Sequence, residues 1–171
     1  CLPSVSVELP YMLLFFLLTD SENRESLSKN GITHILSVYN NATPVIEYLC
    51  IHAADTSSQN LLQHFKESIG FIHECRLNGG VCLVHCLAGV SRSTTMVVAY
   101  LMTVTHYSWE ECLSAVKAVR SFVGPNYGFQ QQLEEYQNTT VSEVNTMTAT
   151  DSFYLNVQQA GLNTECFCII F

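Results

Sequence analysis

The residues with the clearest chemical potential lie between His85 and Ser93. Cys86 opens this segment, and Arg92 follows it with five residues between them. A loop of that length curls around one phosphate-sized oxyanion, and a guanidinium binds two of its oxygens through a bidentate fork. The backbone N–H groups of such a loop, with a helix N-terminus behind them, form an anion cradle. The spacing therefore indicates a site for one phosphate-like group.

The same donors would make Cys86 a nucleophile. A cysteine at a helix N-terminus beside a cation has a pKa lowered to ~3.5–7.5, which leaves it ionised at neutral pH. Gly89 allows close backbone approach, and Ser93 could donate its hydroxyl to the departing thiolate while also capping the next helix. A core cysteine at a strand end is the alternative for Cys86, but it leaves the coincidence of these residue types unexplained. His85 either orients the loop and tunes the thiol or is a satisfied buried histidine.

The neighbouring segments predict what positions this loop. The short apolar run Val81 to Val84 is typical of a fully buried strand. Residues 94–105 carry no charge, which predicts an interior helix. Strands are predicted at 32–38 and 45–51. A helix is predicted through 62–72, capped by Ser57 or Ser58 and ended by Gly79 and Gly80. Two more helices are predicted at 108–119, with a Ser108–Glu111 capping box, and at 127–136. This alternation predicts an α/β fold with a central mixed sheet flanked by helices.

Composition limits the class of protein. The 171 residues suffice for about one domain, and 48% hydrophobic with 13% charged residues excludes disorder of the whole chain. Seven Lys and Arg against fifteen Asp and Glu give a formal charge of −8, which disfavours nucleic acids and anionic membranes as partners. Eight cysteines without a Cys-x-x-Cys pair do not predict a zinc site. We expect a reduced, intracellular protein without a secretory signal.

The two ends differ from the middle. Tyr11 to Leu18 is a continuous apolar run, too short for a membrane span of about 20 residues. It is either a buried strand near a sheet edge or a truncated targeting segment. From Gln137 onward the chain is rich in Asn, Thr and Ser and has no Lys or Arg. We therefore predict a divergent N-terminal strand region at 1–26, a core at 27–136 and a poorly ordered or loosely docked tail at 137–171.

The segment His-Cys-x-x-Gly-x-Ser-Arg-Ser resembles the signature of cysteine-dependent dual-specificity protein phosphatases. The similarity extends from about Leu27 to Tyr136 and is strongest to a small atypical subgroup, the type 22 and type 15 enzymes that include the JNK-pathway-stimulating phosphatase. The other matching segments are 27–30, 33–38, 53–55, 64–69, 71–77, 102–105 and 125–129. The resemblance implies a protein tyrosine phosphatase-like fold and hydrolysis of phosphotyrosine and phosphoserine/threonine on proteins.

The resemblance also implies roles for residues outside the loop. It makes Asp55 the general acid, although an aspartate there could simply form a turn or cap a helix. It also implies that Asn126 holds the phosphate loop, residues 86–92, in place. The alternative is that Asn126 is only a turn residue after Pro125.

The implied reaction has two steps and needs no metal or other cofactor. Cys86 attacks phosphorus while Arg92 and the loop hold the oxygens, and Asp55 protonates the leaving group. Asp55 then activates water and Ser93 helps the thiolate leave. The loop positions expected to bind substrate are Leu87, Ala88, Gly89, Val90, Ser91 and Arg92. Cys50 and Cys82 are conceivable disulfide partners of an oxidised Cys86.

Phosphorylated proteins, including components of kinase signalling such as the JNK pathway, are the expected partners. The loop carries no charge besides Arg92, whereas a phosphoinositide phosphatase, the enzymatic alternative, usually has extra lysines there. A catalytically weak phosphoprotein-binding scaffold is the other alternative. We expect a monomer in the cytoplasm, with the nucleus as a second location. Members of the subgroup begin Met-Gly-Asn-Gly and are N-myristoylated; this chain shows no such start and lacks the glycines of their first strand, so membrane attachment stays open.

Overall fold

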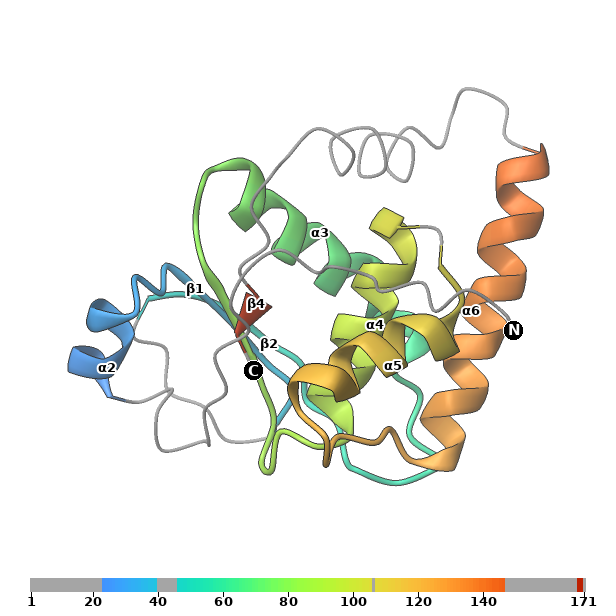
Figure 1. Ribbon diagram of the computed structural model, residues 1–171, viewed down its shortest axis with the longest axis horizontal. Coiled ribbons are helices and arrows are strands. Elements are labelled where there is room, and N and C mark those ends of the chain that lie inside the picture. Colours follow the sequence, from blue (N-terminus) through green and yellow to red (C-terminus); the bar gives the residue numbers. More distant parts are fainter. Residues whose placement is uncertain (1–22, 40–45, 106, 147–168, 171) are drawn as a thin grey trace.

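The computed structural model describes residues 23–39, 46–105, 107–146 and 169–170 (Figure 1). Its elements are helix α2 (Arg24–Lys29), strands β1 (His34–Ser37) and β2 (Glu47–Cys50), the 3₁₀ turn η1 (Leu62–His64), helix α3 (Phe65–Leu77), strand β3 (Cys82–His85), helices α4 (Arg92–Thr105), α5 (Trp109–Val119) and α6 (Tyr127–Thr146), and strand β4 (Ile169–Ile170). The predicted α/β fold is confirmed.

The strands form one sheet in the order β2-β1-β3-β4. Every pairing within the described part of the chain is parallel, so the mixed character that was predicted does not show there. The run Tyr11 to Leu18, predicted as a strand, lies outside the described residues. The register sets Ser37 beside both Cys50 and His85. Because parallel strands end at the same edge, the loops after β1, β2 and β3 start close together.

Alternating side chains divide the sheet into two faces. Leu36 and Val84 point into the main core, to which α3, α4, α5 and α6 contribute, whereas Ile35 and Leu83 face Leu27 of α2. This is the period-two pattern of a strand covered on both faces. Every residue of α4 except Thr105 is buried, which confirms the interior helix predicted from its lack of charge. The α4 helix in turn fixes the loop that precedes it.

The start of α3 corrects the sequence prediction. Neither Ser57 nor Ser58 caps it; both are exposed in the loop, and α3 begins at Phe65 after η1. The side chain of Gln132 on α6 caps this region instead, because its Oε1 accepts from the N–H groups of Leu61 at 2.7 Å and Leu62 at 3.0 Å. Its Nε2 donates to the Gln59 carbonyl at 2.8 Å. A cap from a distant helix leaves no local signal in the sequence.

The helix α6 is longer than predicted. It continues past the expected end at Tyr136 to Thr146, so the first part of the predicted loose tail is helical. Two contacts dock this stretch: the Tyr136 hydroxyl lies 2.8 Å from Thr103 Oγ1, and Gln137 Oε1 accepts from the N–H of Trp109 at 2.8 Å. The capping box at Ser108 that begins α5 is as predicted.

Replacing Gln132 with alanine tests its capping role. Gln132→Ala removes the acceptor of two backbone N–H groups at the part-buried start of η1. We expect the free energy of unfolding to fall by about 1–3 kcal/mol, the cost of leaving buried donors unsatisfied. Urea denaturation measures it, with Gln131→Ala, at the exposed neighbouring position, as control. Equal losses in the two variants would contradict the assignment.

Candidate active site

Three loops meet at the carboxyl edge of the sheet, at the lower edge of the view in Figure 1. They are residues 51–61 after β2, residues 86–91 after β3, and residues 120–126 between α5 and α6. Cys86 follows β3 directly and is buried, and the Ser93 hydroxyl lies 3.2 Å from its sulfur. That distance lets the hydroxyl donate to a thiolate. Because α4 starts at Arg92, Ser93 lies inside the helix and does not cap it.

The guanidinium of Arg92 is fixed from the loop that follows β2. Its Nη1 donates to the carbonyl of Ala53 at 2.9 Å, and its Nε lies 3.6 Å from Oδ2 of Asp55. The ring of Tyr39 lies beneath it, 5.7 Å from the guanidinium carbon, within range of a cation–π interaction. Arg92 is therefore oriented from several sides at the start of α4, beside Cys86 and its loop.

Asp55 is hydrogen-bonded to both other loops. The Ser91 hydroxyl donates to its Oδ1 at 2.8 Å, and Nδ2 of Asn126 donates to the same oxygen at 2.9 Å. The backbone N–H of Asn126 donates to the Ser91 hydroxyl at 3.1 Å and closes the triangle. Because both donors bind Oδ1, a protonated Asp55 would carry its proton on Oδ2. The carboxyl is partly exposed, so this proton is accessible to a ligand.

Asn126 combines the two interpretations that the sequence left open. Its Oδ1 accepts from the N–H of Phe129 at 3.1 Å in the first turn of α6, so it is a turn and capping residue. Its amide also holds Asp55, and its N–H reaches Ser91 in the phosphate loop. Gly128 lies two residues later, where a Cβ atom would collide with the backbone of Ser57. Glycine is required there because α6 and the Asp55 loop are in backbone contact.

The loop backbone turns at Gly89, whose φ of +61° lies in the left-handed region. Leu87 and Ala88 are exposed, Val90 is half-buried, and Gly89 and Ser91 are buried. The Val90 carbonyl accepts from the N–H of Gly124 at 3.0 Å. These contacts hold the substrate-binding positions predicted from the sequence in one curled segment, although the Ser91 side chain turns toward Asp55.

Arg120 is a residue of this region that the sequence analysis missed. It ends α5, is 6% exposed, and its Nη2 lies 3.5 Å from the carbonyl of Ala88 in the phosphate loop. An arginine at a helix C-terminus usually complements the helix dipole. Nothing in its spacing distinguishes it from that common case, because its partner lies 32 residues away along the chain.

His85 is buried at the end of β3, and burial lowers its pKa to about 4. The imidazole is therefore neutral near neutral pH. A neutral ring supplies no positive charge to a thiolate at Cys86, so orienting the loop and filling a buried position are the two roles that stay predicted for His85.

The two suggested disulfide partners of Cys86 are too far away. Cys82 precedes it by four residues along β3, about 13 Å at roughly 3.3 Å per residue. Cys50 is in register with Ser37, which is in register with His85, so it lies two strand spacings, about 9.6 Å, from the residue before Cys86. A disulfide needs Cα atoms roughly 4.4–6.8 Å apart. Neither bond forms without backbone movement.

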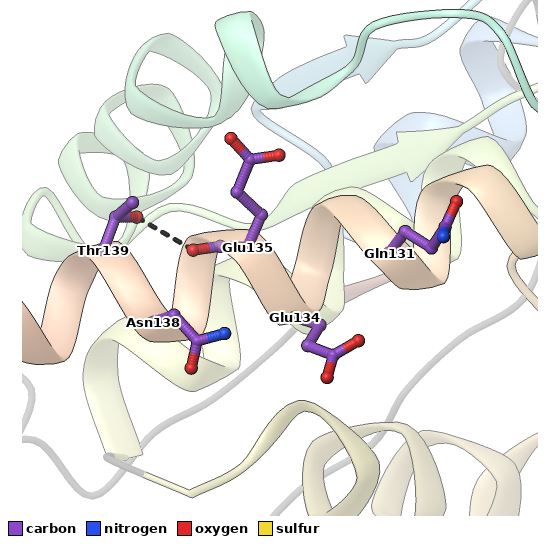
Figure 2. A pocket seen from close by; sticks show the side chains of 5 residues that line it. All are labelled: Gln131, Glu134, Glu135, Asn138 and Thr139. Carbon is purple, nitrogen blue, oxygen red and sulfur yellow. Dashed lines mark hydrogen bonds between the residues drawn. The ribbon is translucent and has the colours of Figure 1, made fainter.

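A pocket of about 440 Å³ lies along α6, lined by Gln131, Glu134, Glu135, Asn138 and Thr139 (Figure 2). Two glutamates give it negative charge, which opposes a phosphate ligand. It shares no residue with the loops around Cys86 and is not a candidate for the same chemistry.

Comparison with known proteins identifies the family. The family model "Dual specificity phosphatase, catalytic domain" matches residues 15–139. The chain belongs to the dual-specificity phosphatase family. Within this family it is similar to Dual specificity protein phosphatase 22-A of Danio rerio, with 82% identity over 72% of this chain and 61% of that protein. It is also 60% identical to Dual specificity protein phosphatase 22 of Mus musculus, over 72% of this chain and 69% of that protein. The subgroup predicted from the sequence is confirmed.

Solved structures agree with this assignment. A crystal structure of DUSP15 has a TM-score of 0.72 and 41% identity to this dual-specificity phosphatase, covering 88% of this chain and 95% of that one. A crystal structure of mouse putative dual specificity phosphatase, complexed with zinc tungstate, has a TM-score of 0.71 and 28% identity, covering 76% and 84%. The chain spans about 61% of the length of the Danio rerio relative.

Two kinds of feature are absent from the described residues. No group of three or more His, Cys, Asp or Glu side chains there is placed to hold a metal ion. Within the same residues, no helix is long and apolar enough to cross a membrane.

The buried His85 predicts how stability depends on pH. Its pKa is about 4 in the folded state and about 6.5 in the unfolded state, so the unfolded state binds more protons between these values. Stability therefore falls as pH drops from about 6.5 to 4, by up to roughly 3 kcal/mol for this residue. Urea denaturation of His85→Gln should show a flatter pH dependence. Part of the slope should persist, because burial, followed by the charge of Arg76, also lowers the pKa of His73.

The matched control is His52→Gln at an exposed position. It should keep the full pH dependence of the unmodified protein. The same slope in His85→Gln as in the control would show that His85 is not the titrating group.

Proposed function

We propose that this dual-specificity phosphatase hydrolyses phosphomonoesters on phosphorylated proteins through a cysteinyl-phosphate intermediate. One observation carries the proposal: Asp55 is hydrogen-bonded onto the loop that starts at Cys86 and ends at Arg92. A nucleophile, an anion-binding cation and a carboxylic acid thus converge at one edge of the sheet. This is the set needed to attack phosphorus, stabilise its oxygens and protonate a leaving group.

In the first step the Cys86 thiolate attacks phosphorus with its electron pair. The S–P bond forms as the P–O bond to the substrate oxygen breaks, and the loop N–H groups with the Arg92 fork bind the other phosphate oxygens. Asp55 gives the proton on Oδ2 to the leaving oxygen, so the leaving group departs as a neutral alcohol or phenol. The triangle of Ser91, Asn126 and Asp55 keeps that oxygen beside the loop during the transfer.

In the second step Asp55, now a carboxylate, accepts a proton from water. The water oxygen attacks phosphorus, the S–P bond breaks, and inorganic phosphate is released. The electron pair returns to sulfur, where the Ser93 hydroxyl at 3.2 Å donates a hydrogen bond to the thiolate. The cycle restores both the thiolate and the protonated acid.

The surroundings of the site favour a protein substrate over a phosphoinositide. Large apolar side chains are exposed around it: Leu87 in the loop by 48%, Phe122 between α5 and α6 by 63%, and Tyr127 beside Asn126 by 71%. Such surfaces suit the side chains that flank a phosphorylated residue. A headgroup with several phosphates would need further exposed cations, whereas Leu87, Ala88 and Val90 are apolar.

Hydrolysis of a small aryl phosphate near neutral pH, with EDTA present, tests the reaction. Turnover should continue without metal. Cys86→Ser should lose it almost completely, since the nucleophile is gone. Asp55→Asn should fall by about 10²–10⁴-fold, the usual contribution of a general acid.

Glu134→Gln, at an exposed position of α6, is the matched control for removing a carboxylate and should hydrolyse at the unmodified rate. Absence of turnover in a folded wild-type protein would overturn the enzymatic proposal. Phosphopeptide binding would then be the activity to measure, because a binding scaffold needs the cradle but no acid.

A double-mutant cycle tests whether Ser91 and Asn126 act through Asp55. Ser91→Ala and Asn126→Ala each remove one hydrogen bond to the carboxylate and should lower kcat/KM about tenfold or more. In an Asp55→Asn background the same substitutions should cost much less, since the acid they position is absent. Equal costs in both backgrounds would mean that these residues act on the loop alone.

A further inference from the structure

The phosphate loop has a second buried guanidinium against it, from Arg120 at the end of α5. This side chain lies close to Gly89: a Cβ atom built there would be 2.9 Å from Nη1 and 3.0 Å from Nη2 of Arg120. The Ala88 carbonyl, one residue earlier, lies 3.5 Å from Nη2. The guanidinium therefore packs on the apex of the loop, whereas Arg92 faces the Asp55 loop.

An aromatic ring also contacts Arg120. Phe122 lies with its ring centre 4.4 Å from the guanidinium carbon, which is stacking distance for a cation–π contact. The planar guanidinium thus contacts both the turn at Gly89 and the ring of Phe122. Lysine has no planar group that could fill this space and hold a carbonyl at once.

We propose that Arg120 is a positioning residue of the phosphate loop, which sets the turn at Ala88 and Gly89 and whose positive charge stabilises the Cys86 thiolate at the start of that loop. The proposal rests on the proposed function, because it assigns Arg120 to the same reaction. The turn matters because Gly89 adopts its left-handed conformation where the loop N–H groups must point toward one oxyanion. A fixed carbonyl at Ala88 keeps the peptide units of the apex from rotating.

The electrostatics of Arg120 support this role. Burial lowers the pKa of its guanidinium, and the negative charge of Cys86 acts in the opposite direction and raises it. A buried charge is costly unless another group compensates it. Since Coulomb attraction is mutual, the charge that the thiolate stabilises on Arg120 also stabilises the thiolate. The guanidinium of Arg120 contacts the loop at Ala88 and Gly89, so its effect passes through the loop and the sulfur.

Alkylation of Cys86 measures this effect without requiring turnover. Iodoacetamide reacts with the thiolate, so the rate at the Cys86 peptide, read by mass spectrometry across a pH series, reports its ionisation. In Arg120→Gln we expect the half-maximal rate to move up by about one pH unit, as for loss of a neighbouring opposite charge. The kcat/KM for an aryl phosphate should fall about tenfold or more. Lys117→Gln, which removes an exposed cation from the same helix, should change neither quantity.

Arg120→Lys separates charge from shape. It retains a positive charge, so the alkylation midpoint should stay near that of the unmodified protein. Its kcat/KM should still fall, because the ammonium cannot both stack on Phe122 and hold Ala88. An unchanged midpoint in folded Arg120→Gln overturns the proposal. If that variant does not fold, as judged by circular dichroism, Arg120→Lys decides: unmodified kcat/KM in this variant overturns the proposal.

Alkylation of Cys86 and turnover of an aryl phosphate together separate the role of Arg120 from the phosphatase activity. One outcome is that the wild-type protein turns over an aryl phosphate while Arg120→Gln has the same alkylation midpoint and the same kcat/KM. That result refutes the role of Arg120 and leaves the phosphatase activity standing. A shifted midpoint in Arg120→Gln, in a wild-type protein that hydrolyses no phosphate ester, refutes the phosphatase activity and supports the electrostatic role of Arg120.

Discussion

The carboxyl oxygen Oδ1 of Asp55 joins three segments that are far apart in the sequence. It accepts hydrogen bonds from Ser91, in the loop before α4, and from Asn126, in the turn before α6. Each segment enters the site from a different element, and none would place its functional group without the others. The sheet supplies a common edge, and this one acceptor sets the distances across it. The hydrogen bond from Arg92 to the Ala53 carbonyl is a second contact that holds the loop carrying Asp55.

This arrangement explains why the helices of the main core matter to the chemistry. α4 is buried along nearly its whole length, so its first residue, Arg92, has little freedom to move. α6 contributes Asn126 from its start and Gln132 from its second turn, and both contact the stretch between β2 and η1. The position of the acid therefore depends on the packing of two helices as well as on the loop that carries it.

The sequence predicted those parts of the site that are local. Cys86, Gly89, Arg92 and Ser93 belong to one short segment, and their spacing alone indicates an anion-binding loop. Asp55 and Asn126 were predicted through resemblance, because a hydrogen bond between residues 71 positions apart leaves no periodic pattern. Gln132 and Arg120 were missed for the same reason: each acts on a backbone carbonyl or N–H group, which any residue could provide. The end of α6 was also misplaced, because its polar sequence resembles that of a loose tail. The hydrogen bond that docks it, from the N–H of Trp109 to the side chain of Gln137, has no signal in the sequence.

The contact at Gly128 has a consequence for the time course of turnover. Because no side chain separates α6 from Ser57, the Asp55 loop lies directly on the helix, and the Ser91 hydroxyl binds its carboxylate. A loop held at both points has little room for a large closing motion between substrate binding and bond cleavage. Solvent viscosity should then affect encounter and product release, while the chemical steps proceed at a rate set by electrostatics within a preorganised site.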